Sequence, residues 1–72
     1  MKRQVVESRT MRSFGYSVKK EVLEVEFRSG AIYQYLEVPP TIHNQLLKAE
    51  SKGCHFNSEI RDTYPFVRVD RR

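Results

Sequence analysis

The chain contains one cysteine, no tryptophan and no apolar run of membrane-spanning length. A single cysteine cannot form a disulfide within the chain, and a transmembrane helix needs about 18 or more consecutive apolar residues. The first residues, MKRQVVESRTMRS, are charged where a signal peptide would have its apolar stretch. We therefore expect a cytoplasmic protein that makes no membrane contact.

The motifs of common enzymes and metal sites are also missing. The sequence has no Gly-x-Ser-x-Gly, no His-Glu-x-x-His, no phosphate-binding loop and no pair of Cys-x-x-Cys knuckles. Cys54 and His55 are adjacent, and neighbours on a helix point about 100° apart, so His55 is poorly placed as a base for the thiol. We expect no catalytic residues, no metal and no cofactor, and we leave the reactivity of Cys54 open.

The composition is that of one small globular domain. The 72 residues are 39% hydrophobic and 31% charged, with a net charge of +4. A chain of this length buries only about 60% of the surface that its unfolded form exposes, which leaves little room for a large internal cavity. We predict a flexible N-terminus over residues 1–10, a single domain over residues 11–69 and a frayed tail over residues 70–72.

Three segments have the residue pattern of strands. Residues 23–28, LEVEFR, alternate between apolar and charged side chains, which is typical of a half-buried strand. The run AIYQYLEV at residues 31–38 follows Ser29-Gly30, so we predict a hairpin, and residues 11–18 supply an earlier strand. The sequence therefore predicts a three-stranded antiparallel meander.

The length of the hairpin loop decides which face of the sheet carries the tyrosines. With Ser29-Gly30 as a two-residue loop, Tyr33 lies opposite Glu26 and Tyr35 lies opposite Glu24, away from the apolar face. A three-residue loop would reverse this assignment, because side chains alternate strictly along a strand. We favour the two-residue loop.

Two short helices are predicted after the sheet. Pro39-Pro40 ends the last strand of the meander and suits the first turn of a helix. We interpret Gly53 as the C-terminal stop of this helix, and apolar residues four apart place a second helix over about residues 54–62. The predicted class is α+β: a three-stranded antiparallel meander followed by two short helices packed on one face, with a short C-terminal extended segment at residues 66–69.

Polar residues around the second helix form a candidate anion site. If one helix ends at Gly53 and the next begins at once, free backbone N–H groups lie beside Lys52. Asn57 and Arg61 share a helical face and offer an amide and a forked guanidinium to a phosphate or carboxylate. The structural alternative is that Gly53 and Asn57 are caps and that Arg61 pairs with a nearby carboxylate.

Tyrosines supply a second candidate surface. Tyr16, Tyr33 and Tyr35 lie in predicted strands, and a sheet that displays aromatic rings can stack unpaired RNA bases. In a chain without tryptophan, the same rings could instead be core packing, and Glu24 and Glu26 beside them would repel phosphates. The full candidate set for nucleic-acid or anion binding is Lys52, Gly53, Asn57, Arg61, Tyr64, Arg68, Tyr16, Tyr33 and Tyr35.

Two ordered motifs resemble the KTSC domain family. The first, FxxGxxYxYxxVP, runs from Phe27 to Pro39, and the second, SxGxxFNxxIR, runs from Ser51 to Arg61. Domains of this family also occur at the C-terminus of some lysyl-tRNA synthetases, so the resemblance implies a role in RNA metabolism. We expect a small non-enzymatic module that binds RNA, either transfer RNA or a single strand. The alternative is a protein interaction module that uses a sheet edge or self-association.

Overall fold

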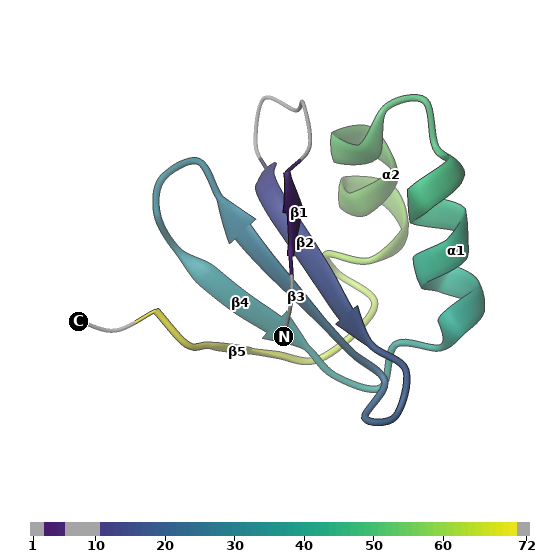
Figure 1. Cartoon of the computed structure of the whole chain (residues 1–72), viewed down its shortest axis with the longest axis horizontal. Helices are drawn as coiled ribbons and strands as arrows, with labels where there is room; N and C mark the ends of the chain where they lie inside the picture. Colours follow the sequence, from purple (N-terminus) through teal and green to yellow (C-terminus); the bar gives the residue numbers. More distant parts are fainter. Residues whose placement is uncertain (1–2, 6–10, 71–72) are drawn as a thin grey trace.

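A computed structural model describes residues 3–5 and 11–70 of the chain, and it shows one antiparallel sheet with two helices (Figure 1). The sheet has five strands in the order β1-β2-β3-β4-β5. The strands are β1 (Gln4–Val5), β2 (Met11–Ser17), β3 (Val22–Phe27), β4 (Ile32–Tyr35) and β5 (Phe66–Arg68), and the helices are α1 (Pro40–Lys48) and α2 (Lys52–Glu59). The predicted α+β class, with an antiparallel meander, two helices and a C-terminal extended segment, is confirmed.

The two edge strands extend the meander that the sequence predicted. Strand β1 pairs with β2 and lies in the segment that we expected to be flexible, where residues 1–2 and 6–10 fall outside the described residues. Strand β5 pairs with β4, and Asp70 lies two residues beyond its end. No helix in residues 3–5 and 11–70 is long and apolar enough to cross a membrane.

The hairpin between β3 and β4 has a three-residue loop, so the two-residue loop that we favoured is wrong. Leu23 pairs with Tyr35 and Val25 pairs with Tyr33. The Phe27 carbonyl accepts a hydrogen bond of 2.9 Å from the Gly30 N–H. Gly30 has a φ of 101°, a conformation that glycine reaches without a Cβ clash, and this freedom allows the longer loop.

The register places the tyrosines and the acidic residues on opposite faces of the sheet. Tyr33 and Tyr35 share the apolar face with the side chains opposite them on β3, whereas Glu24 pairs with Gln34 on the other face. The Gln34 amide donates to Glu24 Oε1 at 2.9 Å, and Arg3 Nε lies 3.5 Å from Glu24 Oε2. Glu24 therefore has its hydrogen-bond and ion-pair partners on its own face of the sheet, and the acidic residues of β3 do not border the tyrosines.

The core lies between the apolar face of the sheet and the helices. Its buried side chains are Met11, Phe14, Leu23, Val25, Tyr35, Val38, Leu46, Phe56 and Ile60. Helix α1 contributes Leu46 and helix α2 contributes Phe56, whose ring meets Tyr35 edge to face at 5.2 Å. Ile42 of α1 and Ile60 at the end of α2 add to these contacts, so a few large apolar side chains fix each helix against the sheet.

The helix boundaries differ from the prediction at Gly53. Helix α1 has proline in its first turn as expected, but it ends at Lys48, and Gly53 is the second residue of α2. Ser51 caps α2 because its Oγ accepts a hydrogen bond of 3.3 Å from the Cys54 N–H. The interpretation of Gly53 as a helix stop is wrong because a serine cap two residues earlier starts the next helix.

Candidate ligand-binding groove

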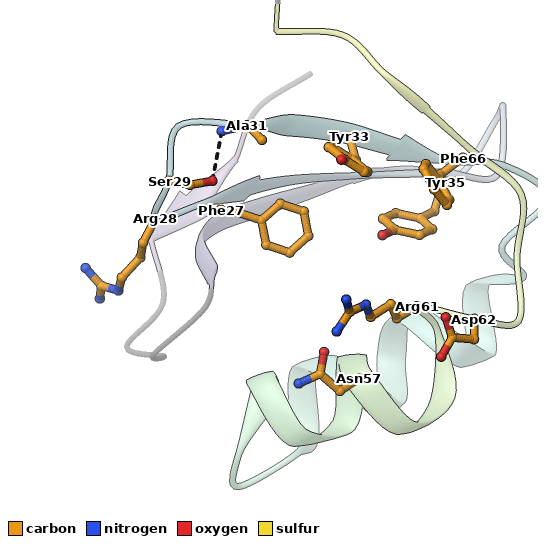
Figure 2. Close-up of a pocket in the computed structure, with 10 residues that line it drawn as sticks. All are labelled: Phe27, Arg28, Ser29, Ala31, Tyr33, Tyr35, Asn57, Arg61, Asp62 and Phe66. Carbon is orange, nitrogen blue, oxygen red and sulfur yellow. Dashed lines mark hydrogen bonds between the residues drawn. The ribbon is translucent and has the colours of Figure 1, made fainter.

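A groove opens between the hairpin of β3 and β4 and the C-terminal end of α2 (Figure 2). Its volume is about 610 Å³, which is within the range of small-ligand sites. The sheet side is an aromatic wall formed by Phe27, Tyr33, Tyr35 and Phe66, and the helix side is a polar wall formed by Asn57, Arg61 and Asp62. The hairpin loop, which includes Arg28, borders one end of the groove.

The aromatic wall is a set of rings in mutual contact. Tyr33 and Phe66 stack with centroids 5.1 Å apart and planes at 24°, and Phe27 meets Tyr33 edge to face at 5.5 Å. Phe66 is 50% exposed because it lies on β5 at the edge of the sheet, where it pairs with Tyr35. The wall therefore ends in one ring with open surface, onto which a planar ligand could stack.

Tyr35 contributes a hydroxyl rather than a ring face. The residue is only 2% exposed, and its ring is enclosed by Phe56 and the neighbouring rings of the sheet. Figure 2 shows the hydroxyl directed into the groove, on the side where Arg61 lies. Burial, reinforced by Tyr33 and Asp62 and opposed by Arg61, raises the pKa of Tyr35. The hydroxyl is thus a proton donor at neutral pH.

The polar wall comes from α2 and the turn that follows it. Asn57 and Arg61 are four residues apart, and both side chains point towards the aromatic wall in Figure 2. The backbone N–H of Arg61 donates to the Phe56 carbonyl at 2.9 Å, which holds the start of the turn in place. Over residues 3–5 and 11–70, no carboxylate lies within 4.0 Å of the Arg61 guanidinium, so the structural ion pair that we considered is not formed there.

The groove therefore joins four of the nine residues in the sequence-based candidate set. Those four are Tyr33, Tyr35, Asn57 and Arg61. Lys52 does not line the groove, and its Nζ donates to the Ala49 carbonyl at 3.2 Å instead. Gly53 lies beside Lys52 in the first turn of α2, at the other end of the helix from Arg61.

Three further candidates have structural partners elsewhere. Tyr16 stacks on His43 at 4.4 Å, and its hydroxyl donates to the Val38 carbonyl. Tyr64 packs against the core. Arg68 Nε lies 2.7 Å from Asp70 Oδ1 in an ion pair just beyond β5. These three residues make their contacts within the fold, and none of them lines the groove.

Sequence reasoning did not assign Phe27, Phe66 and Asp62 to the site. Phe27 was assigned to the core, and the hairpin register brings it beside Tyr33 at the rim. Phe66 reaches the groove only because β5 returns next to β4, a pairing that no local pattern in residues 66–69 specifies. Asp62 follows Arg61 directly and lines the groove because the turn after α2 directs it there.

Comparison with known proteins decides the family. The family model of the KTSC domain matches residues 7–64 of the chain. The chain belongs to the KTSC domain family. The crystal structure of a KTSC domain protein from Yersinia pestis matches this KTSC domain with a TM-score of 0.92 and 35% sequence identity, over 96% of this chain and 97% of that one. The resemblance of the two sequence motifs is therefore confirmed.

Relatives of this KTSC domain occur both alone and inside a larger enzyme. An uncharacterised protein of Stutzerimonas stutzeri is 45% identical over 71 residues, which are 97% of this chain and the whole of that protein. A lysine–tRNA ligase of Nostoc punctiforme is 40% identical over 63 residues, which are 88% of this chain but only 11% of the ligase. The KTSC domain is thus also found as a small part of lysyl-tRNA synthetases.

Proposed function

We propose that this KTSC domain is a non-enzymatic module that binds RNA and holds an unpaired nucleotide in the groove. The observation that carries the proposal is the aromatic wall facing Arg61 and Asn57 across a groove of about 610 Å³. Single-stranded RNA is recognised by stacking bases on aromatic rings while positive side chains hold the phosphates. The groove has both the aromatic rings and the positive side chain that this kind of recognition uses.

Phe66 and Tyr33 supply the rings on which a base would stack. Phe66 keeps half of its surface open, and the ring of Tyr33 lies behind it in a stacked arrangement. Stacking of a base on such a ring contributes about 1 to 3 kcal/mol. Tyr16, one of the three tyrosines of which we expected one or more to stack on a base, is already stacked on His43 and does not line the groove.

Arg61 and Asn57 supply the hydrogen-bond donors for the phosphate. The guanidinium of Arg61, in the turn after α2, offers two parallel N–H donors, and the amide of Asn57 on α2 offers a neutral donor on the same side of the groove. Glu24 and Glu26, which the sequence placed beside the tyrosines, lie on the opposite face of the sheet, so that Asp62 is the acidic residue that lines the groove. The corrected register thus removes the repulsion that Glu24 and Glu26 would exert on a phosphate beside the tyrosines.

The relatives support RNA as the partner. A segment similar to this chain lies within a lysine–tRNA ligase, an enzyme that acts on tRNA. A module that contributes affinity for RNA without chemistry of its own would serve both inside such an enzyme and as a separate chain. We place this chain in the cytoplasm, where such an RNA is available.

The test is a titration of a structured tRNA and a single-stranded oligonucleotide at two salt concentrations. Binding should weaken as salt rises, because counterions are released when phosphates are neutralised. Arg61→Lys keeps the charge but loses the fork, so we expect the affinity to fall about tenfold while the melting temperature stays the same. Lys20→Gln, at the β2–β3 turn away from the groove, is the control and should change the affinity little.

Two results would overturn the proposal. The first is no binding to either nucleic acid at low salt. The second is a large loss of stability in Arg61→Lys with unchanged affinity, which would make Arg61 a structural residue.

The exposed edge of β5 supports protein binding as a second candidate function. Phe66 and Val67 are 50% and 46% exposed, and β5 is the last strand of the sheet among the described residues. Such an edge can pair with a strand of another protein or of a second copy. Association of this kind would depend little on salt, so sedimentation at the two salt concentrations separates it from RNA binding.

A further inference from the structure

The Tyr35 hydroxyl is the polar end of a side chain whose ring is buried. Tyr35 is 2% exposed, and no described residue forms a hydrogen bond with its hydroxyl. The hydroxyl oxygen is not among the buried polar atoms that lack a partner, so it keeps contact with the solvent in the groove. Tyrosine hydroxyls in such positions usually have a hydrogen-bond partner, and a group that enters the groove from solvent can supply one.

The hydroxyl and the polar wall aim at the same part of the groove. Figure 2 shows the Tyr35 hydroxyl on the sheet side, with the Arg61 guanidinium and the Asn57 amide across from it on the helix side. All three side chains line the same cavity. Their donors match a ligand group with several acceptor oxygens and negative charge.

The burial of Tyr35 favours an end group over the middle of a strand. A phosphodiester inside a strand has chain on both sides, and both must leave the groove if the phosphate reaches a residue that is 2% exposed. A terminal phosphate has chain on one side only. A phosphate monoester also carries three strong acceptor oxygens and close to two charges, which suits the Arg61 fork together with a separate donor from Tyr35.

We infer that the groove binds the phosphorylated end of an RNA strand, with the terminal phosphate between Tyr35, Arg61 and Asn57 and the adjoining base on Phe66. This inference rests on the proposed function and names the ligand class of the same site. Asp62 also lines the groove and would repel a phosphate placed next to it. Its carboxylate instead suits the hydroxyl groups of the ribose attached to that phosphate.

The experiment compares three single-stranded RNAs of one sequence: one with a 5′-phosphate, one with a 3′-phosphate and one with hydroxyls at both ends. We expect one of the phosphorylated strands to bind at least about tenfold more tightly than the hydroxyl-ended strand, as hydrogen bonds to a charged group allow. The two phosphorylated strands identify which end is recognised.

Tyr35→Phe is the decisive variant because it keeps the ring and removes only the hydroxyl. It should lose most of the preference for the phosphorylated strand, while its melting temperature stays the same, since no described residue forms a hydrogen bond with the hydroxyl that is removed. Tyr16→Phe is the matched control. It loses a hydroxyl that donates to the Val38 carbonyl, so it should melt earlier and keep the preference.

The outcomes separate the two proposals. If all three RNAs bind wild type equally, or if Tyr35→Phe keeps the full preference, the end-binding inference is overturned and RNA binding stands. If none of the three binds at low salt, the proposed function fails and the inference fails with it. A preference that disappears in Tyr35→Phe and persists in Tyr16→Phe establishes the phosphate site.

Discussion

Glu37 has a left-handed backbone, with a φ of 61°, in the connection between β4 and α1. This conformation costs a non-glycine residue about 1 to 2 kcal/mol, and glycine avoids most of it, although glycine loses more freedom on folding. The Glu37 side chain is exposed, so little packing is lost on its removal. We expect Glu37→Gly to raise the free energy of unfolding by up to about 1 kcal/mol, measured by urea denaturation.

Glu50→Gly is the control for this prediction. Glu50 is also exposed and lies in the connection between α1 and α2, but its φ is not positive. The same substitution there gains no relief of strain and should lower the free energy of unfolding. Equal losses in both variants would contradict the assignment of strain to Glu37.

Single side chains also decide how the groove is built. Tyr33 and Tyr35 are separated by one residue and lie on one face of β4, yet one presents a ring and the other a hydroxyl. The difference arises because Phe56 of α2 covers the ring of Tyr35, while Tyr33 contacts the half-exposed Phe66. Burial by a neighbouring element therefore sets which chemistry each tyrosine offers.

At the scale of elements, the start of α2 depends on Ser51. Its Oγ accepts from the Cys54 N–H, and α2 has no acidic residue in its first turn to assist. We expect Ser51→Ala to lower the free energy of unfolding by about 1 kcal/mol. Ser58→Ala is the comparison, since Ser58 is exposed within the same helix and donates only to the His55 carbonyl. Similar losses in urea denaturation of both variants would argue against the cap.

The attachment of β5 to β4 depends on Asp70. One carboxylate oxygen accepts from the Ile32 N–H at 3.1 Å and from Arg68 Nε at 2.7 Å. The hydrogen bond from Arg68, followed by that from Ile32, holds the pKa of Asp70 well below its ordinary value. The ionised form therefore stabilises the fold at neutral pH. That contribution is lost only as the pH falls below the ordinary range of an aspartate, near about 4.

We predict that Asp70→Asn removes this pH dependence. Wild type should be more stable than the variant at pH 7, and the difference should shrink as the pH is lowered below about 4. Hydrogen exchange at pH 7 should show faster exchange of the Ile32 amide, which loses its charged acceptor. A constant difference between the two proteins at all pH values would show that Asp70 acts by some route other than its charge.

At the scale of the whole molecule, one core position on α1 carries much of the helix attachment. Leu46 is fully buried, while its neighbour Leu47 is 38% exposed. Truncating a buried leucine costs about 2 to 5 kcal/mol, a large share of the stability of so small a domain. We expect Leu46→Ala to be severely destabilised in thermal melts.

Leu47→Ala makes the same chemical change one residue away and tests the helix orientation. Because Leu47 remains partly exposed, its truncation leaves no closed cavity and should cost far less than that of Leu46. Equal losses at the two positions would mean that α1 packs with a different face against the sheet.

The sequence alone determined the class of the fold and most of its elements. Strict alternation over residues 23–28 identified β3, Pro39-Pro40 marked the start of α1, and two ordered motifs identified the family. These features succeeded because each depends on the chain within a few residues: side chains alternate along a strand, and proline lacks an N–H donor. Asn57 and Arg61 were predicted to share one side because they are four residues apart, and both line the groove, although α2 ends at Glu59 and Arg61 lies in the turn that follows.

Only the tertiary structure decided the register of the hairpin and the content of the groove. A loop of two or three residues differs little in local energy, but it moves Tyr33 and Tyr35 from one face of the sheet to the other. The packing of Phe56 and the return of β5 then placed Tyr35 and Phe66 beside Arg61. These contacts join residues far apart in the chain, and their free energy comes from burying surface that exists only when the whole domain has folded.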